Sequence, residues 1–354
     1  MVKEVLASKG AKVFGIDIVK SGGNKMSYFL TPISTNKLNL CNRLVMPPMG
    51  TEKAKADGKI TSEQISYYGE KSKGGYISLV IIEHSFITLQ GKASEKQLSI
   101  ADDSVIDSLK ELADLLHKNG SKAAMQLNHA GGVADKNTGM DIVGPSAVPH
   151  PSNNTIPLAL TKEQINTIVQ EFKDAAIRTQ KAGFDAVEIH SAHGYLLNQF
   201  YSPITNKRMD EYGGDIRGRI RIHIEIIKAI RDAIGENFPI FLRLGAGDYM
   251  EGGSTVADSI IAAKELEKAG VDILDISGGM CLYRNPYSTQ AGYFSDTSLP
   301  IKQVVSIPVI LTGGITTPQQ AEELLSQGVA DLIGVGRAIL KNSNWPKEAI
   351  EYFV

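Results

Sequence analysis

Short apolar runs alternate with longer amphipathic segments along most of the chain. Four times a helix-like segment ends at a glycine and a nearly continuous apolar run follows, at Gly120, Gly183, Gly270 and Gly328. A glycine just past a helix readily adopts the left-handed conformation that closes it. Runs with few polar interruptions are typical of parallel strands covered on both faces. The pattern therefore predicts repeated strand–helix units.

The remaining apolar runs extend this pattern to eight strands, near 44–47, 77–83, 122–127, 185–190, 239–244, 271–276, 308–312 and 331–335. Helices are predicted between them over 62–73, 102–118, 161–182, 217–234, 255–269 and 317–327, with a shorter one near 297–305. Capping-box sequences start two of these helices, over 161–164 and 317–320. Eight alternating units favour one α/β domain, a closed (β/α)8 TIM barrel, over two open sheets.

Three segments do not fit the repeating units. The stretches 128–160 and 278–296 are long, and because both follow strands we expect them to lie over the catalytic face of the barrel. Residues 6–18 resemble the second strand of a dinucleotide-binding fold, but no glycine-rich phosphate loop precedes them. We predict an N-terminal extension of uncertain role over 1–25 and a single barrel domain over 26–354.

Composition narrows the classes of function. The 354 residues are 42% hydrophobic and 21% charged, and the formal net charge of -2 favours neither nucleic acid nor an acidic membrane as a partner. Cys41 and Cys281 are too few for a disulfide framework or a cysteine-ligated cluster, so a reducing cytoplasm is the expected setting. No apolar run approaches the ~20 residues of a membrane span, and Glu4, Lys9 and Lys12 interrupt any signal-peptide core. A small-molecule substrate is the expected partner, and homo-oligomer formation is left open.

The fourth predicted strand ends in residues that can carry chemistry. Functional groups of such barrels sit at the carboxyl ends of strands, and here His190, His193 and Tyr195 follow one another closely. Two imidazole N–H groups converging on one oxygen would polarise a carbonyl, and a protonated phenol could act as a general acid. Each residue alone could equally be a packed or capping side chain. Metal binding is disfavoured because His-x-x-His lacks the helical spacing and an obvious third ligand.

Other strand ends point to a phosphate and to an electron-rich ring. The last two strands end in glycines followed by an arginine, a place where barrels often bind phosphate, although tight turns are the alternative; the residues are Gly313, Gly314, Gly336 and Arg337. Gln126 and Arg243 interrupt apolar strands and therefore need partners. The partner of Arg243 could be a reduced, anionic flavin, an acid on a neighbouring strand such as Glu188, or both. By themselves the glycines do not distinguish FMN from a sugar phosphate.

Together these residues resemble the old yellow enzymes, or NADH:flavin oxidoreductase family, near the flavin barrels of dienoyl-CoA reductases and of enoate or bile-acid reductases. The resemblance covers roughly 28–345, and its motifs are LTPI at 30–33, NRLVMPPM at 42–49, HSAHGYLLNQF at 190–200 and NKRMDEYGG at 206–214. It implies a tightly bound FMN, with NADH or NADPH as electron donor. It further implies an enone or enoate substrate, whose β-carbon receives hydride from flavin N5.

The resemblance also implies a role for each site residue. Those expected to bind FMN are Pro48, Met49 and Gly50 along the ring, His84 through its backbone, Gln126 at the pyrimidine edge, Arg243 at N1 and O2, and Gly313, Gly314, Gly336 and Arg337 at the phosphate. His190 and His193 should hold the substrate carbonyl, and Tyr195 should protonate the α-carbon. We add Tyr283, from the aromatic-rich stretch 278–296, as an expected substrate contact.

Departures from the family keep alternatives open. Gly50 replaces a cysteine of some members, and the stretch 129–132 lacks an arginine that many carry. The paired histidines favour a simple enone over a dienoyl-CoA, and because the sequence shows no iron–sulfur site or second nucleotide domain, we expect electrons directly from a soluble donor. The alternatives are another phosphate-binding barrel enzyme, such as an FMN oxidase or an aldolase-like lyase, and a non-catalytic flavin protein. An aldolase would need a strand-end lysine, which is missing, and a storage protein would not need the histidines and the tyrosine.

Overall fold

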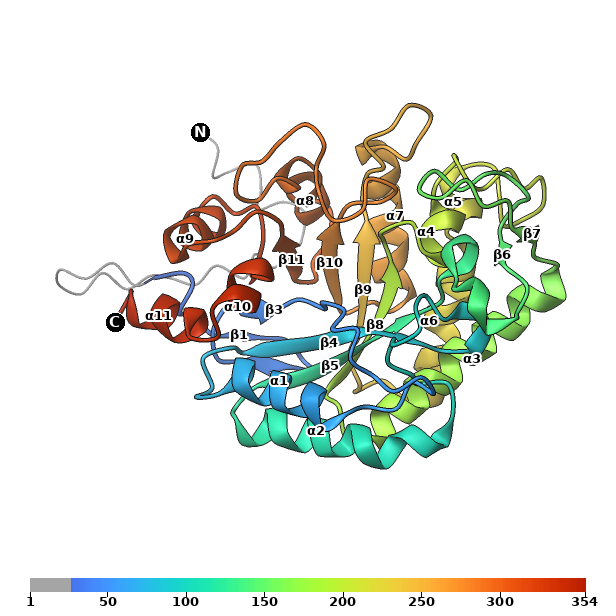
Figure 1. Cartoon of the computed structure of the whole chain (residues 1–354). Coiled ribbons are helices and arrows are strands. Elements are labelled where there is room, and N and C mark those ends of the chain that lie inside the picture. Colours follow the sequence, from blue (N-terminus) through green and yellow to red (C-terminus); the bar gives the residue numbers. More distant parts are fainter. Residues whose placement is uncertain (1–26) are drawn as a thin grey trace, which may run out of the picture.

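Eight parallel strands close into a barrel in the computed structural model, which describes residues 27–354 (Figure 1). They run in chain order, and the last pairs with the first: β3 (Leu44–Met46), β4 (Leu79–Phe86), β5 (Lys122–Asn128), β8 (Ala186–Ser191), β9 (Ile240–Gly245), β10 (Ile273–Ser277), β11 (Val309–Thr312) and β12 (Leu332–Gly334). Every predicted strand falls on one of these, which confirms the (β/α)8 TIM barrel. The stretch 6–18, with its dinucleotide-like pattern, lies outside the described residues.

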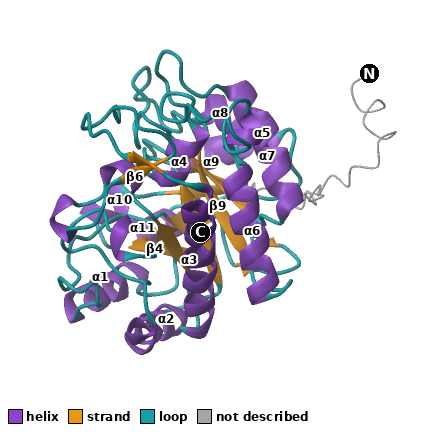
Figure 2. Cartoon of the chain, turned by 90° about the vertical axis from the view of Figure 1, so that its right-hand side faces the viewer, coloured by secondary structure: helices purple, strands orange, loops and turns teal. Residues whose placement is uncertain are grey.

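Helices surround the strands (Figure 2). The longer ones are α1 (Ser62–Ser72), α2 (Ile106–Lys118), α3 (Lys162–Lys181), α6 (Arg221–Ile234), α7 (Val256–Ala269), α8 (Ser295–Lys302) and α9 (Pro318–Ser326). Shorter ones are α4 (Leu196–Tyr201), α5 (Ile216–Arg219), α10 (Arg337–Lys341), α11 (Trp345–Glu351) and the 3-10 turns η1 (Leu89–Gly91), η2 (Asp103–Val105), η3 (Gly131–Val133) and η4 (Lys136–Thr138). The helix predicted over 217–234 is in fact two, because Ile220 leaves the helical conformation. The one predicted near 297–305 is shifted toward the N-terminus.

Local capping chemistry sets the helix ends as the sequence predicted. Both capping boxes form, with the hydroxyl of Thr161 or Thr317 accepting from a backbone N–H and the glutamine three residues on accepting in return. The four glycines that follow helices have φ angles of 93°, 82°, 118° and 71°. A residue with a side chain rarely adopts these φ angles, so each glycine permits a sharp turn into the next strand.

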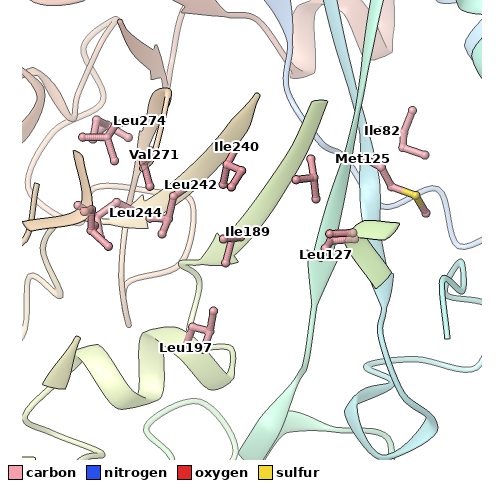
Figure 3. Close-up of a cluster of buried hydrophobic side chains, with 14 of the residues drawn as sticks. Ile82, Met125, Leu127, Ile189, Leu197, Ile240, Leu242, Leu244, Val271 and Leu274 are labelled. Carbon is pink, nitrogen blue, oxygen red and sulfur yellow. The ribbon is translucent and has the colours of Figure 1, made fainter. Parts of the chain in front are cut away.

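Strand residues alternate between the barrel interior and the helices. The interior begins with an apolar layer, formed by Val45, Leu79, Ile81, Ala124, Ala186, Phe241, Ile273, Ile310 and Leu332. A short hairpin, β1 (Ile33–Ser34) and β2 (Asn39–Leu40), adds Leu38 and Leu40 to this cluster. Side chains that point outward, such as Ile189, Leu242 and Leu244, form the core shared with the helices (Figure 3).

The long loops follow the carboxyl ends of strands. Stretch 128–160 leaves β5 and carries the two-residue strands β6 (Val143–Gly144) and β7 (Leu158–Ala159), and stretch 278–296 leaves β10. His150 of the first loop is hydrogen-bonded to the turn after β8, because its Nε2 lies 2.8 Å from the carbonyl oxygen of Gly194. The loops therefore cover the end of the barrel at which the candidate residues gather.

Candidate active site

One cavity of about 360 Å³ opens at the carboxyl end of the barrel. This volume is in the range of small-molecule and cofactor sites. The cavity is lined by all the residues that the sequence singled out for it: Pro48, Met49, Gly50, His84, Gln126, His190, His193, Tyr195, Arg243, Tyr283, Gly313, Gly314, Gly336 and Arg337. Residues from many different strand ends thus meet in one place, although they are spread over most of the sequence.

The two histidines after β8 lie side by side at the cavity wall. The ring centroids of His190 and His193 are 5.1 Å apart, with the planes at 84°. His193 has a φ of 60°, which strains a residue with a side chain, and Gly194 follows with 73°. The carbonyl of Gly194 accepts from Gln199 Nε2 at 2.7 Å, and its N–H donates to Asn198 Oδ1 at 2.7 Å. These bonds hold the strained turn and so fix the direction of both imidazoles.

Burial keeps the two imidazoles of this cluster neutral and its phenol protonated. Burial lowers the pKa of His190 and of His193 well below the usual value, and Arg243 opposes a further positive charge. His190 Nδ1 is buried with no partner among the described residues, whereas His193 Nε2 lies 2.7 Å from Ser277 Oγ. Burial raises the pKa of Tyr195 to about 12, so its phenol keeps its proton at neutral pH. Its ring centroid is 5.1 Å from that of His190.

His84 brings a third imidazole to the cavity through its side chain. The register of β4 against β5 shifts between Ile82 and Ser85, and His84 lies at this irregularity. Its Nδ1 is 3.1 Å from both Gln97 Nε2 and Asn128 Nδ2, and two amide donors require Nδ1 to accept. Nε2 then carries the proton, and burial lowers the pKa to about 4, which keeps the ring neutral. The expected backbone contact with flavin stays a prediction.

The cavity floor is a buried polar layer that stands on the apolar layer of the barrel. Arg243 Nε lies 3.2 Å from Asp275 Oδ2, and Gln126 Nε2 donates to Glu188 Oε2 at 2.8 Å. The acid paired with Arg243 is therefore Asp275 on β10, whereas the sequence pointed to Glu188 on β8. Arg243 has a neighbouring strand on each side, and the register places Asp275 directly opposite it.

Glycines shape the opposite end of the cavity. Gly313 and Gly314 have φ angles of 141° and 67°, and Tyr293 packs so closely that a Cβ on Gly313 would lie 2.6 Å from its ring. Arg337 Nη2 lies 3.3 Å from the Tyr293 hydroxyl. Among residues 27–354, Arg337 forms no ion pair with a carboxylate. Glycine backbone along the cavity wall, beside a guanidinium that pairs with no carboxylate of residues 27–354, suits a phosphate.

Comparison with known proteins agrees with this geometry. Residues 28–352 match the model of the NADH:flavin oxidoreductase / NADH oxidase family. The chain belongs to this family. A relative is NADH oxidase of Thermoanaerobacter brockii, 41% identical over 320 residues, which are 88% of this chain and 48% of that protein. The chain thus spans about half the length of this relative.

Two solved structures show the same flavin-oxidoreductase barrel. Morphinone reductase superposes with a TM-score of 0.80 at 26% identity, over 94% of this chain and 91% of that one. A 2-naphthoyl-CoA reductase complex with 2-naphthoyl-CoA superposes with a TM-score of 0.85 at 26% identity, over 92% of this chain and 52% of that one. Another morphinone reductase structure contains tetrahydroNAD. The cofactor of this NADH:flavin oxidoreductase is accordingly FMN.

The cavity of this flavin oxidoreductase fits FMN on its own residues. The glycine-lined end with Arg337 suits the phosphate, and the floor of Gln126 and Arg243 suits a polar ring edge. Thr312 Oγ1 is buried and has no hydrogen-bond partner among the described residues, so the protein alone does not satisfy every polar group of the cavity wall. We therefore assign the FMN site to this cavity as a proposal.

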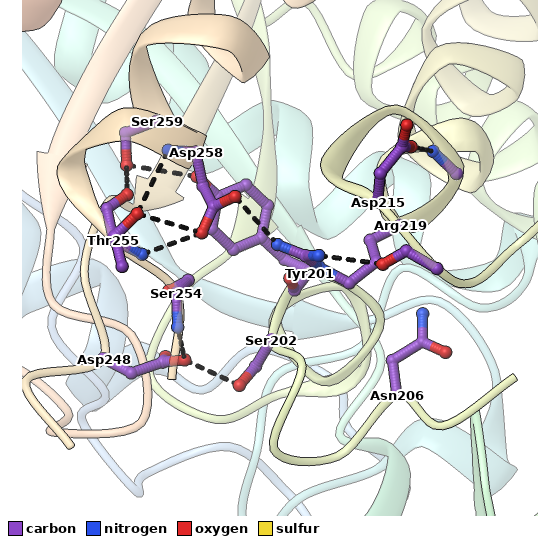
Figure 4. Close-up of polar contacts among 12 residues, drawn as sticks. Tyr201, Ser202, Asn206, Asp215, Arg219, Asp248, Ser254, Thr255, Asp258 and Ser259 are labelled. Atoms are coloured by element: carbon purple, nitrogen blue, oxygen red, sulfur yellow. Dashed lines mark hydrogen bonds and ion pairs between the residues drawn. The ribbon is translucent and has the colours of Figure 1, made fainter. Parts of the chain in front are cut away.

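A buried carboxylate holds the loops behind the flavin-oxidoreductase site (Figure 4). Asp248 accepts from Ser202 Oγ at 2.6 Å, from Ser254 N at 2.7 Å and from Met280 N at 2.9 Å. These donors come from segments after β8, β9 and β10, so one side chain ties three loops together. Its N–H and O–H partners offset the cost of burying the charge.

Several residues that line this family site were missed by the motif analysis, namely Pro47, Thr312, Ile315, Thr316, Gly334 and Leu340. Pro47, Thr312 and Ile315 each adjoin a predicted residue in the chain, and strand ends would have included Thr312. Leu340 lies on α10, whose single turn has too short a pattern to predict. From the aromatic-rich stretch 278–296, three residues line the cavity: Tyr283, Arg284 and Tyr293.

Two kinds of feature are absent from the described part of the chain. Across residues 27–354 no group of three or more His, Cys, Asp or Glu side chains is arranged to hold a metal ion. Within the same residues no helix is both long and apolar enough to cross a membrane.

Proposed function

We propose that this flavin oxidoreductase is an ene-reductase that uses NADH or NADPH to reduce the activated C=C bond of an α,β-unsaturated carbonyl compound. The observation that supports this most is the set of two neutral imidazoles and one protonated phenol on one cavity wall, facing the floor of Gln126 and Arg243. These groups are what a polarised enone needs: donors for its oxygen and an acid for its α-carbon.

Each side chain has a distinct task in this proposal. FMN, when bound, accepts hydride from the nicotinamide and supplies it to the β-carbon of the alkene. His190 and His193 donate N–H groups to the carbonyl oxygen and stabilise the negative charge that grows there. Tyr195 gives its proton to the α-carbon. Arg243 stabilises negative charge at the pyrimidine edge, and the walls orient both reactants.

One specific observation favours a second candidate. The Thermoanaerobacter brockii relative is named an NADH oxidase, so a chain of this kind could pass electrons to oxygen, a free flavin or a quinone without a dedicated alkene. Turnover would then depend less on His190, His193 and Tyr195.

Cys41 and Cys281 are both free thiols, which fits a reducing compartment, and we propose the cytoplasm as the location of the protein.

An anaerobic titration separates the two candidates. The purified protein should be yellow, lose its colour with NADH or NADPH, and regain it when an enone such as cyclohexenone is added. Recovery of colour only on admission of air, with every enone inert, would favour the oxidase. A colourless protein that does not take up added FMN would contradict both.

A further inference from the structure

The acidic residues under the cavity floor are unexplained by the proposed chemistry. Glu188 and Asp275 are fully buried and do not line the cavity, yet both contact groups that do. Each lies on the inward face of its strand, two residues above a member of the apolar layer, Ala186 or Ile273. They therefore form a layer of their own between the hydrocarbon interior of the barrel and the site.

The hydrogen-bond partners of this layer do not suffice for two carboxylates. Glu188 Oε1 and Asp275 Oδ1 are buried and accept no hydrogen bond from the described residues, and Asp275 Oδ2 has only the ion pair with Arg243 Nε at 3.2 Å. A single guanidinium, Arg243, faces the two acids. Two buried negative charges that share one guanidinium would be costly, whereas one proton on Glu188 lets it donate to Asp275.

Electrostatics assigns that proton to one of the two acids. Burial and the neighbouring charge of Asp275 raise the pKa of Glu188 well above the usual value. For Asp275, burial also raises the pKa, to about 6, but Arg243 and the hydrogen bond from Glu188 hold it down. At neutral pH the layer then contains one positive and one negative charge, Arg243 and Asp275, with Glu188 as a neutral donor.

We propose that Glu188 and Asp275 are positioning residues, in which a protonated Glu188 holds an ionised Asp275 against Arg243 and Asp275 sets how strongly Arg243 favours electrons on the bound FMN. A free guanidinium would stabilise added negative charge fully, and a paired one does so less. Glu188 also orients the Gln126 amide by accepting from its Nε2. This inference rests on FMN binding only, not on the alkene.

Two isosteric variants isolate the charge of Asp275. In Glu188→Gln the new amide can still donate to Asp275, so the midpoint potential of bound FMN should stay within about 10 mV, roughly twofold in the equilibrium. Adding Asp275→Asn removes the counter-charge, and the amide already introduced at position 188 cannot ionise to replace it. The double variant should favour reduced FMN at least tenfold over E188Q, a rise of about 30 mV for a two-electron couple.

A control variant and a second readout keep the test decisive. Asp272→Asn removes an Arg–Asp pair just before the same strand, where Arg231 Nη2 lies 2.7 Å from Asp272 Oδ2, and should leave the potential unchanged. The infrared spectrum of the wild-type holoenzyme should contain a protonated-carboxyl band that E188Q lacks, even if the double variant does not fold. Equal potentials in E188Q and the double variant, or the same protonated-carboxyl band in wild type and E188Q, would overturn the inference. Failure to bind FMN would instead contradict the proposed function.

Discussion

Replacing Tyr195 with phenylalanine tests the proton-donor assignment with little structural disturbance. The Tyr195 hydroxyl forms no hydrogen bond with the described residues, so its removal leaves no buried partner unsatisfied. The ring keeps its packing between His84 and His190, with centroids 5.3 Å and 5.1 Å away. We therefore expect the free energy of unfolding to change by less than about 0.5 kcal/mol.

The expected loss is confined to alkene reduction. General acid catalysis typically contributes about 10²–10⁴-fold, or about 3–5 kcal/mol of the activation barrier. Tyr195 has no proton to give in nicotinamide oxidation, so that half-reaction should change by about twofold or less. Because the pKa of Tyr195 is about 12, the phenol stays protonated across ordinary assay conditions. The ratio of wild-type to variant rates should therefore be constant from about pH 6 to about pH 9.

Stopped-flow absorbance measures both half-reactions separately. Bleaching of the flavin by NADH under argon gives the first, and its return on mixing with an enone gives the second. A variant that slows bleaching more than colour return would refute the assignment. So would a rate ratio that changes tenfold between the two ends of the pH range, since this would place the titrating acid on another residue.

Other predictions test the binding groups and the fold. His190→Ala with His193→Ala should slow enone reduction by about 10²–10³-fold or more and weaken binding of phenols, with FMN retained; unchanged enone kinetics would reject the role. Gly313→Ala combines a φ of 141° with a Cβ 2.6 Å from Tyr293, and should cost about 1–3 kcal/mol of stability and lower FMN affinity. Gly139→Ala, at a φ of 70° with no neighbour within 4 Å, controls for backbone strain alone, and equal FMN affinity in both variants would contradict the proposed phosphate site at Gly313. Burial raises the pKa of Glu171 from 4.5 to about 7, so the folded state binds the extra proton and stability falls as pH rises through this window. Glu171→Gln should therefore gain in melting temperature over wild type on going from acidic to alkaline pH, and a difference that is flat in pH would contradict the shift.

The barrel was predictable because its signals are local. Gly120, Gly183, Gly270 and Gly328 close helices through their own conformational freedom, and capping boxes need only four consecutive residues. Short elements were not predicted because they carry no such local signal. A turn of helix such as α10 has no period to detect, and the break at Ile220 is fixed partly by contacts from elsewhere: Arg219 donates to the carbonyl of Tyr201 at 2.8 Å.

The sequence predicted which residues line the site but not which of them pair with one another. Strand ends and motifs indicated which residues meet, because a barrel brings all its strand ends to one face. Which acid faces Arg243 depends on the register of β9 against β10, and no local pattern encodes that register. Asp275 could have been flagged, since an acid inside the apolar run 271–276 needs a partner as much as Arg243 does.

The direction of each hydrogen bond is harder still to predict from the sequence. His84 is a donor toward the cavity only because Gln97 and Asn128, from two other segments, both donate to its Nδ1. His193 projects as it does because the carbonyl and N–H of Gly194 are both held by side chains of α4. A neutral imidazole can donate or accept, and only its surroundings decide. The chemistry proposed for this cavity therefore depends on residues outside the motifs, and variants of Gln97 or Gln199 should alter it without touching a ligand.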